Sequence, residues 1–388
     1  MQFAADYLET VRRQALYREV TSLEPISAVH IKSGAKNYLN LASNNYLGLT
    51  HCPAVQQASV QAVLTYGTGS GGARLITGSH PYYELLEKNL AAFKETEAAV
   101  VFNTGYMANI GTISALASTG DVIFSDELNH ASIIDGCRLS KAEIVVYRHA
   151  DTGHLAELLN STPCKGKRLI VTDGVFSMDG DIAPLPDIVR LAEQYQALVI
   201  VDDAHATGVI GPGGRGTAAH YGLESKIAVQ IGTLSKALGA EGGFAAGSRQ
   251  LIDYLINRAR SFIFTTALAP ATVAAATAAL AELAAKPELV QTLSSNSAFV
   301  RQRLTAAGFT IAPGITPVIP IMVGSAQTAL DLAKELKNQG LLISAIRPPT
   351  VPQNASRLRL AISAAHNQTE LAAAIDKLTV AARKLAII

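Results

Sequence analysis

The sequence of 388 residues predicts an α/β protein with a mixed, mostly parallel sheet in a large domain and a smaller α+β domain near its C-terminal end. The first observation is a series of short β-branched apolar runs that alternate with helix-length segments. The runs that read as strands are 98–102, 121–125, 143–147, 168–173, 197–203 and 227–233. Near-continuous apolar strands between helices are typical of a sheet that is covered on both faces.

The second observation is a change of pattern after residue 285. Residues 318–324, 341–346 and 357–363 alternate polar and apolar side chains, and helical periodicity appears near 326–339 and 368–385. This order of strands with helices to one side predicts the smaller α+β domain.

Composition supports a folded chain, because 49% of the residues are hydrophobic and 16% are charged. We divide it into a helix and arm over 1–45, a large α/β domain over 46–288 and a small domain over 289–388. The net charge of +1 gives no basic surface for nucleic acid. The Ala-rich segment 265–285 contains a proline and a glutamate, which favours a buried or interfacial helix over a membrane span.

The three cysteines give no metal site and no disulfide framework. Cys52, Cys137 and Cys164 lie far apart in sequence and form no C-x-x-C pair. A reducing cytoplasm fits this pattern, and the charged N-terminal segment reads as an amphipathic helix and not as a signal peptide.

Two glycine-rich segments satisfy G-x-G-x-x-G but lack the structural context of a dinucleotide site. One lies at 67–72 after a helical stretch, and the other lies at 211–216 and contains a proline. That motif has its meaning only between a strand and a helix of one βαβ unit, and no P-loop occurs in the chain. We therefore interpret the segment 67–78 as a backbone loop near a ligand.

Polar residues follow the apolar strand 197–203. Asp202, Asp203 and His205 lie at its end, which is compatible with a solvated strand terminus, with a metal site or with a carboxylate beneath a heterocycle. No convincing further metal ligands accompany them. The next strand runs into Thr233 and Lys236, and a lysine there is either a surface charge or an amine that forms an imine with an aldehyde.

Taken together, the two strand ends favour pyridoxal 5'-phosphate (PLP). This cofactor requires a Schiff-base amine and an acid that keeps its ring nitrogen protonated. The turn at 103–109 lies between a strand and a helix, and the N–H groups of such a helix start suit a phosphate.

At this point the chain resembles the α-oxoamine synthases, which are fold-type-I PLP-dependent transferases related to aspartate aminotransferase. These enzymes condense an amino acid with an acyl thioester and release CO2. The motifs that carry the resemblance are SNNYLGL (43–49), GSGGARLITG (69–78), GYMAN (105–109), NHAS (129–132), DGVFSMDGD (173–181), DDAHATGVIGPGGRG (202–216), TLSK (233–236) and AIRPPTVP (345–352). The last of these favours the family member of biotin biosynthesis, which joins L-alanine to pimeloyl-CoA or to pimeloyl-acyl carrier protein.

The resemblance assigns a role to each matching position. Lys236 would bind PLP covalently, Asp202 would pair with the ring nitrogen, and His130 would stack on the ring and contact substrate. The remaining cofactor-binding positions are Gly105, Tyr106, Ser177, His205, Thr233, Thr265 and Thr266. The two last threonines would serve the partner subunit, because the site of this family lies at a homodimer interface.

Substrate-side positions and departures complete the resemblance. Arg18, Asn44, Arg347 and Thr350 match positions that bind substrate, with Arg347 at the amino-acid carboxylate. Asp173 stands where the family often has glutamate, and Tyr83 stands where a histidine is common.

Three alternatives remain open from the sequence. A sibling enzyme would use glycine with acetyl-CoA, succinyl-CoA or another acyl donor, or serine in place of alanine. A non-catalytic homologue would bind PLP or a protein partner through the same dimer. A nicotinamide-dependent oxidoreductase would bind NAD through the first glycine-rich segment.

Overall fold

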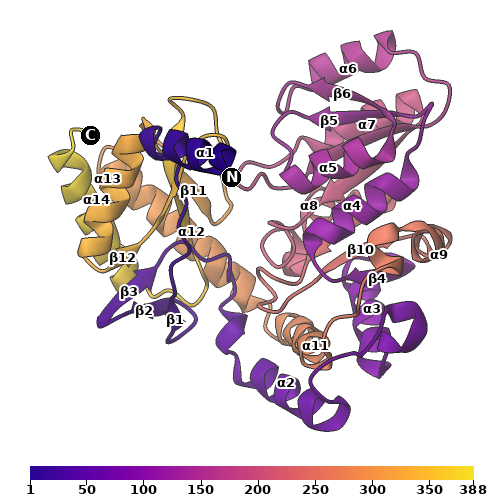
Figure 1. Ribbon diagram of the computed structural model, residues 1–388, viewed down its shortest axis with the longest axis horizontal. Helices are drawn as coiled ribbons and strands as arrows, with labels where there is room; N and C mark the ends of the chain where they lie inside the picture. Colours follow the sequence, from indigo (N-terminus) through magenta and orange to yellow (C-terminus); the bar gives the residue numbers. More distant parts are fainter. The chain divides into compact units, whose positions relative to one another are not determined.

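The computed structural model describes residues 1–388 and divides into two compact units (Figure 1). Unit 1 comprises Met1–Tyr46, Met178–Gly180 and Gln291–Ile388, and unit 2 comprises Leu47–Ser177 and Asp181–Val290. The sequence-based division treats the first 45 residues as an arm of their own. In the structure these residues group with the C-terminal part of the chain.

Unit 2 is built on a seven-stranded sheet with the order β4-β10-β9-β8-β7-β5-β6. Its strands are β4 (Ala98–Phe102), β5 (Val122–Asp126), β6 (Glu143–Tyr147), β7 (Arg168–Asp173), β8 (Ala197–Asp202), β9 (Val229–Thr233) and β10 (Gly243–Gly247). From β9 to β6 every pair is parallel, whereas β10 is antiparallel to both β9 and β4. The predicted mixed, mostly parallel sheet is confirmed.

Strand β10 is the one strand of the unit 2 sheet that the sequence analysis missed. Its sequence, GFAAG, contains one large side chain and no β-branched residue, so it gives little strand signal. Small residues are needed there, because a Cβ added to Gly243 would lie 2.6 Å from the backbone nitrogen of Gly105. The close approach brings β10 against the start of the helix that follows β4.

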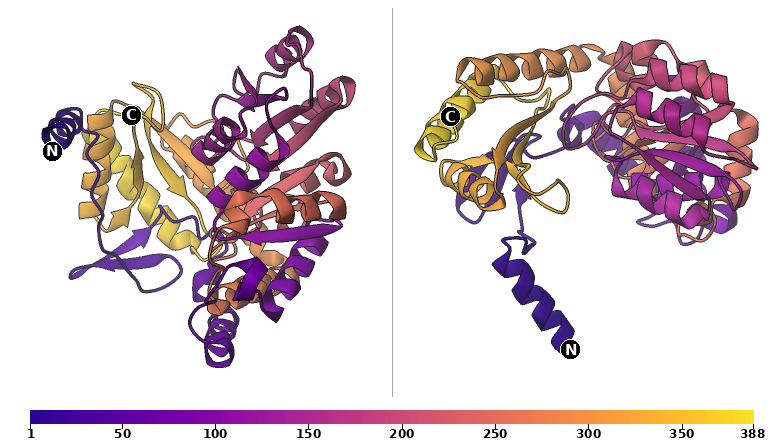
Figure 2. Two further views of the ribbon diagram at one scale, coloured as in Figure 1. Left: turned by 45° about the vertical axis from the view of Figure 1, so that its right-hand side comes forward. Right: turned by 90° about the horizontal axis from the view of Figure 1, so that it is seen from above.

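Alternating side chains of the sheet form two hydrophobic cores, one on each face. Ile123 and Leu169 point to one core, and Val122 and Ile170 point to the other. The helices of the first face are α4 (Gly105–Leu116), α5 (Ala131–Ser140), α9 (Arg249–Arg258) and α10 (Arg260–Ile263), and those of the second are α6 (Thr152–Ser161), α7 (Leu185–Tyr195) and α8 (Thr217–Tyr221). Figure 2 shows the sheet of unit 2 between these helices. Burial on both faces explains why the strands are almost continuously apolar.

Three further helices of unit 2 pack together beside β4. They are α2 (Pro53–Tyr66), α3 (Pro81–Phe93) and α11 (Pro270–Ala285). The last of these is the predicted Ala-rich helix, and most of its apolar residues are buried against the other helices. No helix of the structure is long and apolar enough to cross a membrane.

Unit 1 contains two small sheets and one hydrophobic core. The first sheet joins β1 (Glu24–Pro25), β2 (His30–Ser33), β3 (Lys36–Asn40) and β12 (Leu341–Leu342), and the second joins β11 (Val318–Gly324), β14 (Ser356–Ala361) and β13 (Ser344–Ile346). The helices are α1 (Gln2–Arg13), α12 (Glu288–Ala306), α13 (Ala326–Asn338) and α14 (Gln368–Lys384). The expectation of one strand over 341–346 is wrong. The segment forms two short strands, β12 and β13, separated by Ile343, and these pair in different sheets.

Candidate active site

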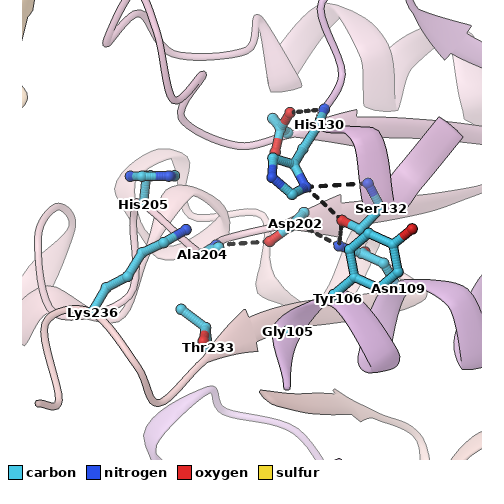
Figure 3. Close-up of a pocket in the computed structure, with 11 residues that line it drawn as sticks. Gly105, Tyr106, Asn109, His130, Ser132, Asp202, Ala204, His205, Thr233 and Lys236 are labelled. Atoms are coloured by element: carbon cyan, nitrogen blue, oxygen red, sulfur yellow. Dashed lines mark hydrogen bonds between the residues drawn. The ribbon is translucent and has the colours of Figure 1, made fainter. Parts of the chain in front are cut away.

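A cavity of about 200 Å³ lies at the carboxyl edge of the sheet in unit 2. The loops after β4, β5, β7, β8 and β9 all contribute to its walls, as expected where parallel strands end at one edge. Its lining residues are Gly105, Tyr106, Asn109, His130, Ser132, Asp173, Asp202, Ala204, His205, Thr233 and Lys236 (Figure 3). Seven residues proposed from the sequence therefore meet in one place: Gly105, Tyr106, His130, Asp202, His205, Thr233 and Lys236.

Asp202, the last residue of β8, is fixed by two donors. Its Oδ2 accepts a hydrogen bond of 2.6 Å from the side-chain amide of Asn109, and its Oδ1 accepts one of 2.8 Å from the backbone N–H of Ala204. The residue is 4% exposed, so its carboxylate is held in one orientation away from bulk water. Such a carboxylate is suited to pair with a cationic ring nitrogen.

His130 is the N-cap of α5, and its ring faces the same cavity. The backbone N–H of Ser132 donates to its Nδ1 at 3.2 Å, which makes Nδ1 an acceptor and leaves the ring proton on Nε2. Burial lowers the pKa of His130, and the nearby Lys236 lowers it further against the opposing effect of Asp202. The imidazole is therefore a neutral donor through Nε2.

Asp173 lies beside Asp202 in the register of β7 and β8. Its Oδ2 accepts a hydrogen bond of 2.7 Å from the backbone N–H of His130, so the shorter side chain makes this contact directly and without a water. Burial raises the pKa of Asp173 well above its ordinary value, and the like charge of Asp202 adds to the effect. Both causes favour the neutral form of the Asp173 carboxyl group.

The start of α4 forms a cradle for an anion. Thr104 caps the helix by accepting from the N–H of Met107, and the twelve-residue helix leaves its first N–H groups to other acceptors. A Cβ added to Gly105 would lie 3.2 Å from Cβ of Thr233, so a side chain at this position would crowd the wall of the cavity. A phosphate at this place would meet the positive end of the helix dipole.

A buried ion pair lies behind the cavity. Nζ of Lys94 is 2.7 Å from Oδ2 of Asp203, and both side chains are 0% exposed. The same ammonium donates to the backbone oxygen of Arg215, and Asp203 accepts from the N–H of Thr217. The pair thus ties the end of β8 to the loop 211–217.

The residues present fit PLP. Lys236 supplies an amine, Asp202 a fixed carboxylate, His130 a flat ring, and the start of α4 a phosphate cradle. The side-chain oxygen of Asn109 is buried without a partner, as expected of a wall that is completed by a polar ligand.

Other proposed positions lie elsewhere. Ser177 follows β7 in unit 2 but does not line this cavity, and Thr265 and Thr266 lie between α10 and α11. The backbone oxygen of Thr266 accepts from the side-chain amide of Asn103 at 2.7 Å. In unit 1, Asn44 accepts from the guanidinium of Arg359 and from the hydroxyl of Tyr46.

Arg18, Arg347 and Thr350 line a separate cavity of about 210 Å³ within unit 1. The guanidinium of Arg347 donates to the backbone oxygen of Ala15. Burial lowers the pKa of Arg347, and Arg18 lowers it further, so two like charges share this cavity. An anionic group of a ligand would relieve their repulsion.

Sequence reasoning gave no role to Asn109, Ser132, Asp173 or Ala204. Asn109 lies one helical turn after Gly105, and a buried polar residue on an otherwise apolar helix is the signal that could have identified it. Asp173 was noted only as a departure from the family. Its contact with His130 depends on the register of two strands and is not visible in the local sequence.

The fold and the cavity define a PLP-type transferase, and comparison with known proteins agrees. Residues 36–378 match the sequence model of the aminotransferase class I and II family. The chain belongs to this family and, within it, to the α-oxoamine synthases that its motifs resemble.

Individual relatives cover nearly the whole chain. An 8-amino-7-oxononanoate synthase of Trichlorobacter lovleyi is 47% identical over 390 residues, which covers 100% of both proteins. The structure of a lysine-to-alanine variant of serine palmitoyltransferase from S. paucimobilis with a bound PLP-myriocin aldimine has a TM-score of 0.94 at 32% identity, and the match covers 99% of this chain and 98% of that one. The structure of 8-amino-7-oxononanoate synthase from Francisella tularensis has a TM-score of 0.77 at 28% identity and covers 90% of this chain and 99% of that one.

Proposed function

We propose that this protein is a PLP-dependent acyltransferase of biotin biosynthesis. It condenses L-alanine with a pimeloyl thioester, carried by coenzyme A or by acyl carrier protein, and produces 8-amino-7-oxononanoate, CO2 and the free thiol. The observation that carries the proposal is the convergence of Lys236, Asp202 and His130 on one cavity. Full-length similarity to proteins named 8-amino-7-oxononanoate synthase supports the substrate pair.

When bound, PLP supplies an electron sink for the pair left on the α-carbon of the amino acid. Lys236 would hold the cofactor covalently through Nζ, and its amine would take up the α-proton of L-alanine. Asp202 keeps a proton on the ring nitrogen, and its fixed orientation means that no reorganisation is needed. The Nε2–H of His130, which faces the same cavity, would donate a hydrogen bond to the thioester oxygen as that oxygen gains charge during C–C bond formation.

The remaining residues bind and orient. The start of α4, with Gly105, Tyr106 and Thr233, would hold the phosphate, and His205 would contact the phenolic oxygen of the ring. The match to the family alone assigns Ser177 to the same contact. Arg347 binds the carboxylate of L-alanine, while Arg18, Asn44 and Thr350 contact the substrates. Binding of both substrates by these residues would hold the reacting carbon atoms close together, so that the bond forms within one complex and not by a chance encounter of two molecules.

We further propose a homodimer in which Thr265 and Thr266 of one subunit reach the phosphate in the other. The exposed side chains of Ile76 and Phe264, 80% and 70% accessible, support a surface that another copy covers. The three unpaired cysteines support a cytoplasmic location.

The test is a turnover assay with PLP-loaded protein, L-alanine and pimeloyl-CoA or pimeloyl-acyl carrier protein, with free thiol and product mass as readouts. Glycine with acetyl-CoA and serine with palmitoyl-CoA run in parallel. The second pair is included because the TM-score of 0.94 to a serine palmitoyltransferase is a specific reason to examine serine. A product mass of 8-amino-7-oxononanoate in the first tubes alone supports the proposal. Product only in a parallel tube contradicts the substrates and retains the chemistry.

A further inference from the structure

A second cavity of unit 1, about 300 Å³ in volume, lies at the start of helix α13. We call it the α13 cavity, and it is lined by Gln14, Leu16, Ser325, Ala326, Pro348, Gln353, Asn354 and Ser356. Its side chains include amides and hydroxyls but no carboxylate. None of these residues has a role in the proposed reaction, so the cavity is a polar site without an assigned ligand.

The helix start presents donors to this cavity. Ser325 caps α13 by accepting from the N–H of Thr328 at 3.0 Å. The cap satisfies one N–H of the first turn and leaves those of Ala326 and Gln327 to other acceptors. Because α13 has thirteen residues, the positive end of a full helix dipole lies at the cavity wall.

A buried hydroxyl of the same wall lacks a partner. Ser356 is 0% exposed, and its Oγ has no hydrogen bond. It is the first residue of β14, opposite the irregular register between Met322 and Gly324 of β11, which leads into α13. A buried polar group without a partner is unfavourable, so this hydroxyl favours a ligand that can accept its proton. This observation is independent of the helix and also indicates an acceptor ligand.

The α13 cavity adjoins the cavity of Arg18 and Arg347, because Leu16 and Pro348 line both. The two cavities therefore share part of their walls, with two guanidinium groups in one and uncharged donors in the other. The two linings together contain two guanidinium groups and no carboxylate, so their only formal charges are positive.

We propose that the α13 cavity binds the 4'-phosphate of the phosphopantetheine arm of the acyl donor. The inference rests on the proposed function, because that reaction consumes a thioester whose thiol belongs to phosphopantetheine. The arm carries this phosphate both in coenzyme A and in acyl carrier protein. The N–H groups of α13, the hydroxyl of Ser356 and the amides of Gln353 and Asn354 are donors for its oxygen atoms, and the apolar Leu16 and Pro348 lie beside the chain of the arm.

The first test is Asn354→Asp, which places a negative charge in the cavity. Asn354 has a φ of 61°, a left-handed conformation that Asp also tolerates, so the backbone is retained. Asn37→Asp adds the same charge to an exposed position of unit 1 and is the matched control. Gln353→Glu is a second variant with the same expected direction.

The assay compares KM values for pimeloyl-CoA, pimeloyl-acyl carrier protein and pimeloyl-pantetheine, which lacks the phosphate. We expect Asn354→Asp to raise KM for a phosphate-bearing donor about tenfold by charge repulsion, while KM for pimeloyl-pantetheine changes less than about twofold. A rise for pimeloyl-CoA alone, for the carrier protein alone or for both supports the site and identifies the source of the phosphate. Equal changes in KM for all three donors, or the same changes in KM for Asn37→Asp, overturn the proposed phosphate site.

A binding measurement keeps the inference testable if no turnover is found. Calorimetry with 4'-phosphopantetheine and with pantetheine, on the PLP-loaded protein, separates the phosphate from the arm. We expect the phosphorylated ligand to bind the original protein about tenfold more tightly than Asn354→Asp, and Ser356→Ala to weaken it several-fold. Equal affinities for the two ligands overturn the α13 site, whereas a lack of turnover alone contradicts only the proposed reaction.

Discussion

The carboxyl edge of the sheet in unit 2 and the loop between β13 and β14 in unit 1 hold their functional side chains in different ways. At the sheet edge, Asp202 has two donors within 2.8 Å, and the Lys94–Asp203 pair anchors the following loop. In unit 1, Arg347 and Thr350 lie on a loop whose neighbours, Ala15 and Arg18, come from the other end of the chain. The contrast teaches that Asp202, proposed for chemistry, is fixed by buried partners at a sheet edge, whereas Arg347 and Thr350, proposed for substrate, lie on a loop between strands.

The largest expected effect is that of Lys236→Ala. Without the amine the protein loses both its covalent hold on PLP and its proton acceptor, and we expect kcat to fall at least about 10⁴-fold. Turnover, together with borohydride reduction and mass spectrometry of the cofactor adduct, measures both losses. Lys226→Ala removes an exposed lysine and serves as the control. Retention of turnover and of the adduct in Lys236→Ala would remove this residue from the mechanism.

Breaking the ion pair behind the site tests whether buried partners fix the sheet edge. Lys94→Met leaves Asp203 charged and fully buried, and we expect the free energy of unfolding to fall by about 3 to 5 kcal/mol. Chemical denaturation measures the loss. The double variant Lys94→Met with Asp203→Leu removes both charges and should regain most of the stability. A double variant as unstable as the single one would show that packing matters here and not the charge.

Arg347→Ala tests the loop of unit 1. Loss of the guanidinium should raise KM for L-alanine about 30-fold or more, with a smaller change in kcat. Arg347→Lys keeps the charge but lacks the paired donors of the guanidinium group. Its KM for L-alanine should lie between those of the original protein and of Arg347→Ala. Steady-state kinetics with L-alanine as the varied substrate measures the effect. A fall in kcat at constant KM would contradict the assignment of Arg347 to substrate binding and group it with the residues proposed for chemistry.

His149 should make the stability of the sheet edge in unit 2 depend on pH. Its ring nitrogens lie 3.0 Å from Asp126 and 2.8 Å from Asp181, which joins the end of β5 to the loop after β7. Burial lowers the pKa of His149, but the hydrogen bonds to Asp126 and Asp181 outweigh it and raise the pKa to about 10.

A raised pKa in the folded state means that stability is fully present below the ordinary histidine pKa of about 6.5 and is lost as pH rises through 10. We therefore expect His149→Gln to lower the free energy of unfolding by about 2 kcal/mol at pH 6 and by much less near pH 10. Denaturation curves at the two pH values measure the difference. A loss that does not change with pH would mean that the charge of His149 contributes nothing.

Asp173→Asn has the smallest expected effect. The amide oxygen can still accept from the N–H of His130, and burial beside Asp202 raises the pKa of Asp173, which favours the neutral form that the amide resembles. We expect Asp173→Asn to change kcat less than about threefold. Asp173→Ala removes the acceptor and should lower kcat by more.

The pKa of Asp173 also predicts the pH dependence of stability. Because the folded pKa is raised, the original protein loses stability relative to Asp173→Asn as pH rises from about 4 toward that folded pKa. Denaturation at pH 4 and pH 8 checks the sign. The opposite trend would mean that Asp173 is a carboxylate that the folded state stabilises.

Much of the site could be predicted because it lies at the ends of strands with a strong local signal. The apolar runs before Asp202 and before Thr233 are almost continuous, and polar residues directly after such runs lie at the edge of a parallel sheet. Strand β10 and the break at Ile343 gave no such signal, because small residues and short strands depend on their neighbours for their structure.

The sequence by itself therefore determined the class of fold, the covered sheet and the side chains that end its strands, since hydrophobic periodicity is a local property. Only the tertiary structure decided what holds those side chains. The contacts of Asn109 with Asp202, of Asp173 with His130 and of Arg347 with Ala15 join residues far apart in the chain. They follow from strand register and packing, which bring distant segments together to satisfy buried polar groups and which no single segment encodes.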